Sequence, residues 1–228
     1  MVSKRLVIVP LVIATLGVGS AAAAAELVVN GDFSAGNTGF STDYSLTTMT
    51  PYLFQNAVHG IYAIETASSI AGSSAYGDWT NISTDPTGGD GNVYVSDGAT
   101  NANETVWSET VAVKANSNYT FSFYGAEVSN PCCSNATFQG SINGTVETNL
   151  NTTGSWQQAS VVWNSGSNTT ATLALTDTNL SGPYNDFAID DISLVGAAAP
   201  EPSTWAVMLI GFCGLGALMR RRGVATAT

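Results

Sequence analysis

The stretch Asn118-Tyr119-Thr120-Phe121-Ser122-Phe123-Tyr124 decides the fold class. Aromatic residues at 119, 121 and 123 alternate with Thr120 and Ser122, and this period of two is typical of a β-strand with one buried face. Short runs of this kind recur through the middle of the chain between clusters of Gly, Asn, Asp and Ser, and no long segment there has a helical period. The pattern predicts an all-β fold, an antiparallel β-sandwich of the jelly-roll type.

Further strand signals fill the rest of the middle region. Apolar and β-branched runs predict strands at residues 27–29, 60–66, 75–80, 92–96, 106–113, 136–143, 156–163 and 171–176. Asn143-Gly144 ends one of these runs, and this dipeptide favours the two-residue turn of a β-hairpin. A hairpin is therefore expected around residue 143.

The last predicted strand changes phase in its middle. Phe187 and Ile189 follow one alternation, Ile192 and Leu194 follow another, and Asp190-Asp191 lies where the two meet. A slip of one residue turns the second pair to the wrong face of the sheet unless a bulge absorbs the extra residue. We therefore predict a β-bulge at these aspartates, which would aim carboxylates toward a site.

The charge of the middle region excludes one class of partner. Residues 26–199 contain sixteen Asp and Glu, one Lys (Lys114), no Arg and one His (His59). Nucleic-acid binding relies on Lys and Arg that displace counterions from phosphates, so no nucleic-acid partner is expected. The acidic excess favours either Ca²⁺ binding or solubility in an exported protein.

The N-terminus has the three parts of a secretory signal peptide. Lys4 and Arg5 give a positive start, residues 6–19 are apolar, and Ala23-Ala24-Ala25 offers small residues for cleavage before Glu26. The sequence thus predicts a signal peptide at residues 1–25, which we expect to be helical. The alternative is an uncleaved membrane anchor.

The C-terminus combines a stiff polar segment, an apolar run and a positive end. Pro-Glu-Pro favours an extended, accessible backbone. The 14 apolar residues from Ala206 to Met219 are short for a helix that crosses a bilayer, which needs about 20. The arginines after them favour a cytoplasmic end. The residues that define these three parts are Pro200, Glu201, Pro202, Trp205, Ala206, Arg220, Arg221 and Arg222.

This ending resembles the PEP-CTERM sorting signal of Gram-negative bacteria in its Pro-Glu-Pro-x-x-Trp-Ala form. The resemblance implies export, transient anchoring in the inner membrane by a C-terminal hydrophobic helix, and cleavage near Glu201 by an exosortase-type membrane protease. The expected organisation is a β-sandwich at 26–197, a sorting and transmembrane segment at 198–223 and a cytoplasmic tail at 224–228. The alternatives are an ordinary tail anchor and a buried helix.

The middle region resembles the galactose-binding-like jelly roll of carbohydrate-binding modules of the family 4/9 type. The stretches that carry the resemblance are residues 27–33, 106–113, 118–123, 154–158 and 185–194. The resemblance implies that the first and last strands lie side by side. It also implies a structural Ca²⁺ near them, for which Asp32, Asp190 and Asp191 stand at matching positions. Ser34 departs from the family, because many members have an acidic residue directly after the opening Phe. The alternative for Asp190 and Asp191 is a polar bulge without an ion.

Aromatic residues outside the expected core phase are candidates for sugar binding. Aromatic rings stack on the apolar faces of pyranoses, and amide or carboxylate groups bind the hydroxyls. The selected residues are Trp79 with its neighbour Asp78, Tyr124 on the polar phase of its strand, and Tyr94. The alternative for each ring is a place in the core or in a turn.

No catalytic set stands out, and the chain is predicted not to be an enzyme. A Ser-His-Asp triad would have to use His59, which has no nucleophile motif near it. Cys132 and Cys133 are adjacent and have no metal-binding spacing; free thiols and a disulfide both remain open. Paired carboxylates of a glycosidase remain possible among so many acids.

The sequence thus predicts an exported, non-enzymatic protein of the cell envelope or extracellular matrix, whose jelly-roll domain binds exopolysaccharide. PEP-CTERM resemblance implies coupling to exopolysaccharide production, which motivates the glycan partner. The alternatives are a structural or adhesion protein without a small ligand and, less favoured, a glycan-active enzyme.

Overall fold

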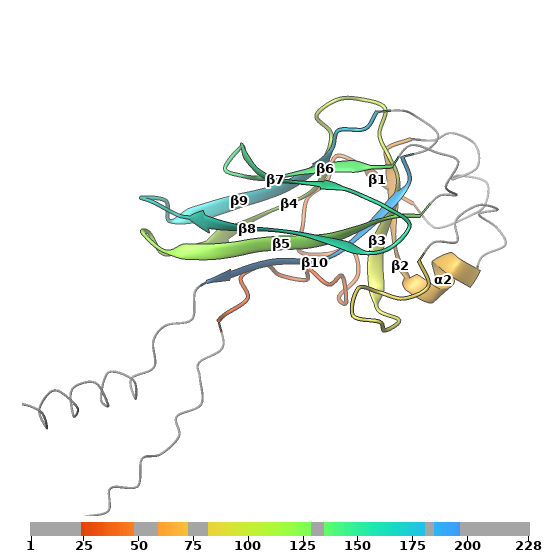
Figure 1. Ribbon diagram of the computed structural model, residues 1–228, viewed down its shortest axis with the longest axis horizontal. Coiled ribbons are helices and arrows are strands. Elements are labelled where there is room, and N and C mark those ends of the chain that lie inside the picture. The colour runs from red at the N-terminus through yellow and green to blue at the C-terminus, as the bar shows by residue number, and fades with distance from the viewer. Residues whose placement is uncertain (1–23, 48–58, 73–81, 129–134, 181–184, 197–228) are drawn as a thin grey trace, which may run out of the picture. The chain divides into compact units, whose positions relative to one another are not determined.

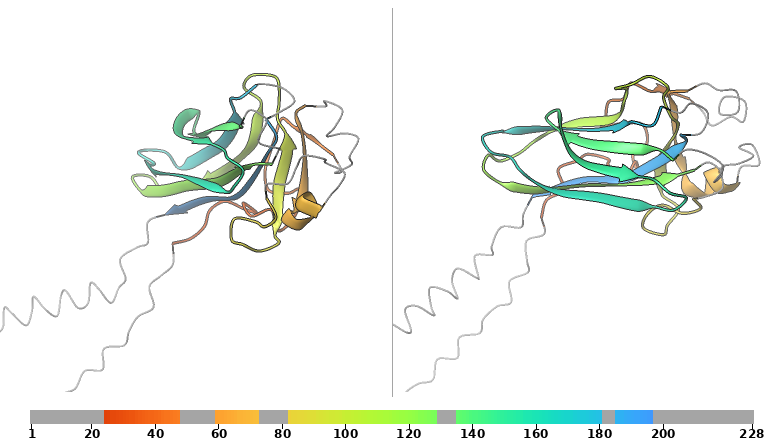
Figure 2. Two further views of the ribbon diagram at one scale, coloured as in Figure 1. Left: turned by 45° about the vertical axis from the view of Figure 1, so that its right-hand side comes forward. Right: turned by 45° about the horizontal axis from the view of Figure 1, so that its top comes forward.

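The computed structural model describes residues 24–47, 59–72, 82–128, 135–180 and 185–196. Residues 24–197 form one compact unit. The predicted all-β sandwich is confirmed: two β-sheets face each other (Figure 1, Figure 2). The predicted signal helix and C-terminal helix, the strand at 75–80, and Cys132 and Cys133 lie outside the described residues. No helix among the described residues is long and apolar enough to cross a membrane.

The larger sheet has six strands and the last strand of the chain at its centre. Its order is β1 (Ser45–Leu46), β2 (Ile61–Thr66), β3 (Asn92–Asp97), β10 (Phe187–Gly196), β5 (Asn118–Glu127) and β8 (Gln157–Asn164). All neighbouring strands are antiparallel except β1 and β2.

The smaller sheet has four strands and contains the predicted hairpin. Its order is β4 (Thr105–Ala112), β9 (Thr170–Asp177), β6 (Thr137–Ile142) and β7 (Thr145–Asn151). Asn143 and Gly144 join β6 to β7 with φ angles of 52° and 78°. Positive φ at both central residues matches the twist of the flanking strands, which is why Asn-Gly suits this turn.

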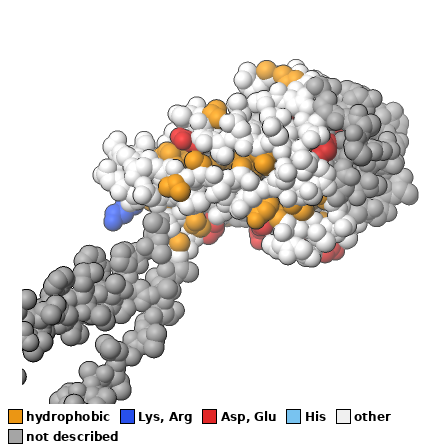
Figure 3. All heavy atoms as spheres, viewed as in Figure 1, with side chains coloured by type: hydrophobic (Ala, Val, Ile, Leu, Met, Phe, Trp, Pro, Cys, Tyr) orange, Lys and Arg blue, Asp and Glu red, His pale blue; other side chains and the backbone are white. Residues whose placement is uncertain are grey.

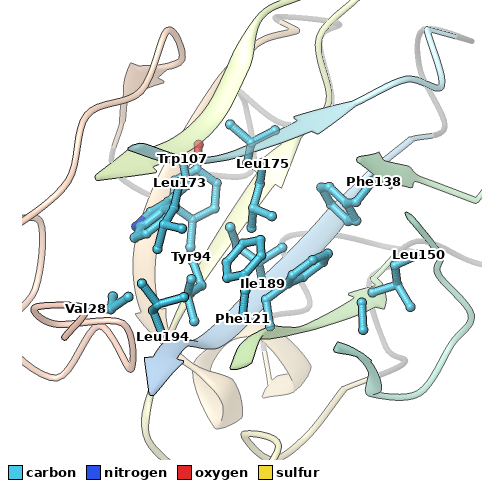
Figure 4. Close-up of a cluster of buried hydrophobic side chains, with 14 of the residues drawn as sticks. Val28, Tyr94, Trp107, Phe121, Phe138, Leu150, Leu173, Leu175, Ile189 and Leu194 are labelled. Carbon is cyan, nitrogen blue, oxygen red and sulfur yellow. The ribbon is translucent and has the colours of Figure 1, made fainter. Parts of the chain in front are cut away.

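The main core lies between the sheets and is rich in aromatic rings. Phe121, Phe123, Phe138 and Trp107 are completely buried there, and the alternation in β5 puts both of its phenylalanines on the inner face. Figure 4 shows Phe121, Phe138 and Trp107 in this core. Burying one such side chain contributes about 1.5–3 kcal/mol. The aromatic phase of β5 therefore anchors the larger sheet on the smaller one.

A second core covers part of the outer face of the larger sheet. Here the short helix α2 (Ala67–Gly72) contributes Ala67 and Ile70, which pack with Val93 and Val95 of β3. Consequently β3 is buried on both faces, whereas the neighbouring part of the outer face near Tyr124 is not covered by this core.

The predicted bulge is present in β10. Asp190 pairs with Tyr124 and Ser193 pairs with Ser122, so two residues of β10 lie opposite one residue of β5. Asp191 takes up the extra length with a φ of 49°. Ile192 and Leu194 thereby return to the core side, as the phase change in the sequence requires.

The first segment of the domain runs beside the second half of β10, as the resemblance implied. The Leu27 amide donates to the Leu194 carbonyl at 3.1 Å, and the Ile192 amide donates to the Gly31 carbonyl at 3.0 Å. The segment forms an isolated bridge at Glu26 in place of the regular strand expected at 27–29. A Cβ on Gly31 would lie 1.9 Å from the Ile192 carbonyl oxygen, so only glycine permits this approach.

Candidate functional site

A pocket of about 520 Å³ opens on the outer face of the larger sheet. We call it the β10 groove; its lining residues are Glu26, Val28, Asn30, Gly31, Asp32, Ser122, Tyr124, Gln158, Asp191, Ile192 and Ser193. Strand alternation explains its polar lining, because the aromatic phase of β5 faces the core and leaves Ser122 and Tyr124 on the outer side.

Two of the lining residues build the wall of the groove. The Glu26 carboxylate accepts hydrogen bonds from the amides of Leu27, Val28 and Leu194, each 2.9 Å long, and from the Ser193 hydroxyl. Asn30 binds the carbonyls of the loop that follows it and accepts the Ala35 amide at 2.7 Å. Both side chains hold the N-terminal segment in place and have little capacity left for a ligand.

Other side chains of the groove keep their binding capacity. Within the described part of the chain, no hydrogen bond is made by the side chains of Ser122, Tyr124, Gln158 or Asp191. Asp32 uses one carboxylate oxygen, which accepts the amide and hydroxyl of Ser34 at 3.2 and 2.9 Å. The groove thus offers one aromatic ring, a hydroxyl, an amide and carboxylate oxygens to a ligand.

An aspartate cluster adjoins the groove: Asp32, Asp85, Asp190 and Asp191. Burial raises the pKa of Asp190 to about 8, and the charges of Asp191, Asp85 and Asp32 add to this effect. Burial, with Asp85 and Asp32, also raises the pKa of Asp191. Charges on the four carboxylates therefore act on one another, and none of the interactions that shift these two pKa values comes from a cation.

Asp85 begins a run rich in Gly and Asp, residues 85–91, and no local sequence pattern marks it as a site residue. One Asp85 carboxylate oxygen accepts the amides of Thr87 and Gly89 and the Thr87 hydroxyl, and the other accepts the Gly91 amide at 2.8 Å. Although burial acts to raise it, these bonds lower the pKa of Asp85. Because Asp85 is ionised, its negative charge favours the binding of a proton or another cation by Asp190 and Asp191.

The chemistry of the cluster fits a hard cation such as Ca²⁺, which takes six to eight oxygen ligands. Among the described residues, however, no three acidic, histidine or cysteine side chains form a group that could hold a metal ion. An ion near Asp32, Asp190 and Asp191 would therefore also need backbone carbonyls or water. One oxygen of Asp190 already accepts the Asp191 amide at 2.8 Å.

The predicted sugar-binding residues have different outcomes. Tyr124 lines the groove. Trp79 and Asp78 lie outside the described residues. The prediction for Tyr94 is wrong: its ring is fully buried, stacked on Tyr62 with centroids 4.6 Å apart and parallel to Phe187 at 6.5 Å. A ring covered on both faces cannot stack on a sugar.

A histidine–aspartate pair lies elsewhere in the domain. His59 Nδ1 is 2.9 Å from Asp97 Oδ1, and burial raises the pKa of Asp97 to about 6 although His59 acts to lower it. In the described part of the chain no serine, threonine or cysteine side chain is bonded to His59. Among the described residues, the pair therefore has no nucleophile of the kind that a catalytic triad requires.

The surface around the groove is acidic. Lys114 is the only Lys or Arg between residues 24 and 197. Figure 3 shows basic side-chain atoms at one end of the face in view and acidic ones spread over it. A surface with so few basic groups has little to offer to phosphate groups.

Comparison with protein-family models identifies the C-terminal signal. The model of the PEP-CTERM protein-sorting motif matches residues 198–222, which include Pro200, Glu201 and the three arginines. This confirms the sorting signal, which implies export and attachment to the cell envelope. A search of curated proteins finds no match to the chain.

Comparison with solved structures supports the fold. A cyclase from Fischerella sp. TAU, solved with 4-(1H-indol-3-yl)butan-2-one, is similar at 12% identity and a TM-score of 0.52, covering 78% of this chain and 100% of the cyclase. A CBM22-1 xylan-binding domain from Paenibacillus barcinonensis is similar at 15% identity and a TM-score of 0.46, covering 79% and 100%.

The tandem CBM22 structure from the same bacterium has 15% identity and a TM-score of 0.47 over 81% of this chain. The present chain spans only 48% of that tandem structure. Likeness in fold does not by itself decide between catalysis and binding.

Proposed function

We propose that the protein is an exported, non-enzymatic component of the envelope or extracellular matrix whose folded domain binds extracellular polysaccharide in the β10 groove. In this proposal the signal peptide directs export, the hydrophobic C-terminal segment tethers the chain to the inner membrane, and an exosortase-type protease then removes it. The sorting motif at 198–222 supports the route, and the groove supports the glycan partner.

The observation that carries the proposal is the position of Tyr124 on the floor of an open polar groove. Tyrosine presents an apolar ring and a polar hydroxyl, the combination that suits a pyranose with an apolar face and a rim of hydroxyls. Gln158 lies opposite Tyr124 in the pairing of β5 with β8, so both side chains point to the same face. Ser122 adds a hydroxyl one step along β5.

Two features favour binding over catalysis. Glycoside hydrolysis needs an acid and a second carboxylate that both reach the sugar. Asp190 has the raised pKa of an acid catalyst, yet it is only 2% exposed and is not among the residues that line the groove. The His59–Asp97 pair lacks a nucleophile among the described residues.

A structural or adhesion role without a small ligand is the second proposal. The outer face of the smaller sheet favours it, since the outward side chains of β9 there include Thr170 and Thr172 and no aromatic residue of β4, β9, β6 or β7 is exposed. Such a face suits broad polar contacts more than the capture of a single sugar chain.

A glycan array and a pull-down with the producer's own exopolysaccharide test the proposal on the compact unit of residues 24–197. We expect binding that falls about tenfold or more in Tyr124→Ala, the loss typical of a central interface residue. Blank results in both assays would leave the structural role. Release of reducing ends would show an enzyme.

A further inference from the structure

The β10 groove has an unusual charge for a sugar site. Its described lining residues include Glu26, Asp32 and Asp191 but no Lys, Arg or His. The Glu26 carboxylate is occupied by four internal hydrogen bonds. The charges that remain available to a ligand are therefore those of Asp191 and of the second oxygen of Asp32.

The backbone holds these two aspartates on one wall of the groove. The bulge fixes Asp191 at a φ of 49°. Gly31 packs against the Ile192 carbonyl and so places its neighbour Asp32 beside the bulge. Both side chains line the same groove. The two carboxylates repel each other, and a positive group between them would relieve that repulsion.

A glycan that enters the groove meets different groups on the floor and on the wall. Tyr124 and Gln158 on the floor suit any pyranose, because they recognise the ring and its hydroxyls. Asp32 and Asp191 on the wall discriminate, since a uronic acid would bring a third negative charge against them. An N-acetyl group offers one amide N–H and no charge, whereas a free ammonium group offers three donors and a positive charge.

Resting on the proposed glycan-binding function, we propose that the ligand is a glycan with protonated amino groups, such as a partly de-N-acetylated hexosamine polymer. Its sugar ring stacks on Tyr124, and its ammonium group donates hydrogen bonds to Asp191 and Asp32. Neutral glycans bind more weakly in the same groove, and uronic-acid polymers are excluded from it.

Calorimetric titrations of the unit of residues 24–197 with three short oligosaccharides test this assignment: chitosan, chitin and oligogalacturonate fragments of equal length. All are run with a chelator, because calcium would compete for both carboxylates. Two partly exposed ion pairs predict about tenfold tighter binding of the chitosan fragment than of the chitin fragment at low salt. High salt should remove most of that difference.

Variants separate the groove from the general acidity of the domain. Asp32→Asn/Asp191→Asn should bind the chitosan and chitin fragments equally. Glu147→Gln, which removes the same kind of charge from β7 in the other sheet, should keep the preference for chitosan. Tyr124→Ala should weaken the binding of both the chitosan and the chitin fragment.

The outcomes distinguish the inference from the function on which it rests. Equal binding of chitosan and chitin fragments that depends on Tyr124 would overturn the amino-sugar assignment and leave glycan binding intact. Tighter binding of oligogalacturonate would do the same. Absence of binding by all three fragments, and by the producer's exopolysaccharide, would overturn both.

Discussion

Asp190 and Tyr124 face each other across β10 and β5, so their side chains lie on the same side of the larger sheet. Asp190 is buried at 2% exposure among other aspartates, whereas Tyr124 lines the open groove next to it. This pairing places the aspartates of the bulge next to the proposed ligand site. It follows that changes at the bulge should affect both stability and binding.

The bulge should tolerate only residues that accept a left-handed backbone. Asp191→Asn and Asp191→Val remove the same charge, but only asparagine adopts a φ near 49° at little cost. We expect the valine variant to be less stable than the asparagine variant by about 1–2 kcal/mol, measured by urea unfolding. Equal stability would mean that Asp191 is not held in that conformation in solution.

The buried aspartates should make the domain less stable at higher pH. The pKa of Asp190 is about 8 in the folded state, well above its ordinary value of 3.8. The folded state therefore holds a proton that the unfolded state has lost between about pH 4 and 8, so stability falls as pH rises through that window, by up to about 1.4 kcal/mol per pH unit for one proton. Asp97 and Asp177, both with pKa values raised to about 6, contribute below pH 6.

Unfolding measured in chelator from pH 4 to 8 tests this expectation. In Asp190→Asn the unfolding free energy should change little between pH 6 and 8, because Asp97 and Asp177 have already lost their protons below that range. A slope between pH 6 and 8 that is unchanged in this variant would show that another group carries the proton.

A cation at the aspartate cluster should stabilise the fold. A ligand that binds only the folded state at 100 times its Kd adds about 2.7 kcal/mol, so we expect a higher Tm in Ca²⁺ than in chelator. Asp190→Asn/Asp191→Asn should lose this response, and Glu147→Gln should keep it. A response that survives in the double variant would place the ion elsewhere.

Tyr94 and Tyr124 should behave oppositely on truncation. Tyr94 is completely buried, so Tyr94→Ala should cost about 3–5 kcal/mol of unfolding free energy. Tyr124 faces the groove, and Tyr124→Ala should change that free energy by about 1 kcal/mol or less while it weakens glycan binding. A large loss of stability in Tyr124→Ala would indicate that its ring supports the fold and would make its binding data uninterpretable.

The sorting signal predicts a processing defect. Glu201→Ala should accumulate in producer cells with its tail uncleaved, because the acidic residue lies in the matched motif. Ser203→Ala, at one of the positions that the motif leaves open, should be processed normally. Detection of the tail by immunoblot distinguishes the two forms, and normal cleavage of the Glu201 variant would contradict the assignment.

Local sequence patterns predicted the parts of the fold that depend on alternation. The aromatic phase of β5 and the phase change at Asp190-Asp191 identified the sandwich and the bulge, because each side chain's face follows from its position in the strand. The same reasoning failed for Tyr94. Helix α2 covers the outer face of β3, so both faces of that strand are buried and alternation carries no information about exposure.

Residues brought together by tertiary contacts were harder to foresee. Asp85 looks like an ordinary turn residue, and only the folded chain shows that its charge acts on Asp190 and Asp191. The first segment gave a clearer signal, since its resemblance to known modules placed Asp32 near the last strand. The groove itself depends on where the second core ends, which no local pattern encodes.

Calorimetric titration of the unit of residues 24–197 with the producer's exopolysaccharide, in parallel for the wild type and Tyr124→Ala, tests glycan binding in the β10 groove most directly. We predict saturable binding by the wild type and a loss of about tenfold or more in the variant, with the unfolding free energy of both proteins alike. Equal binding by the two proteins, or no binding by either, would contradict it.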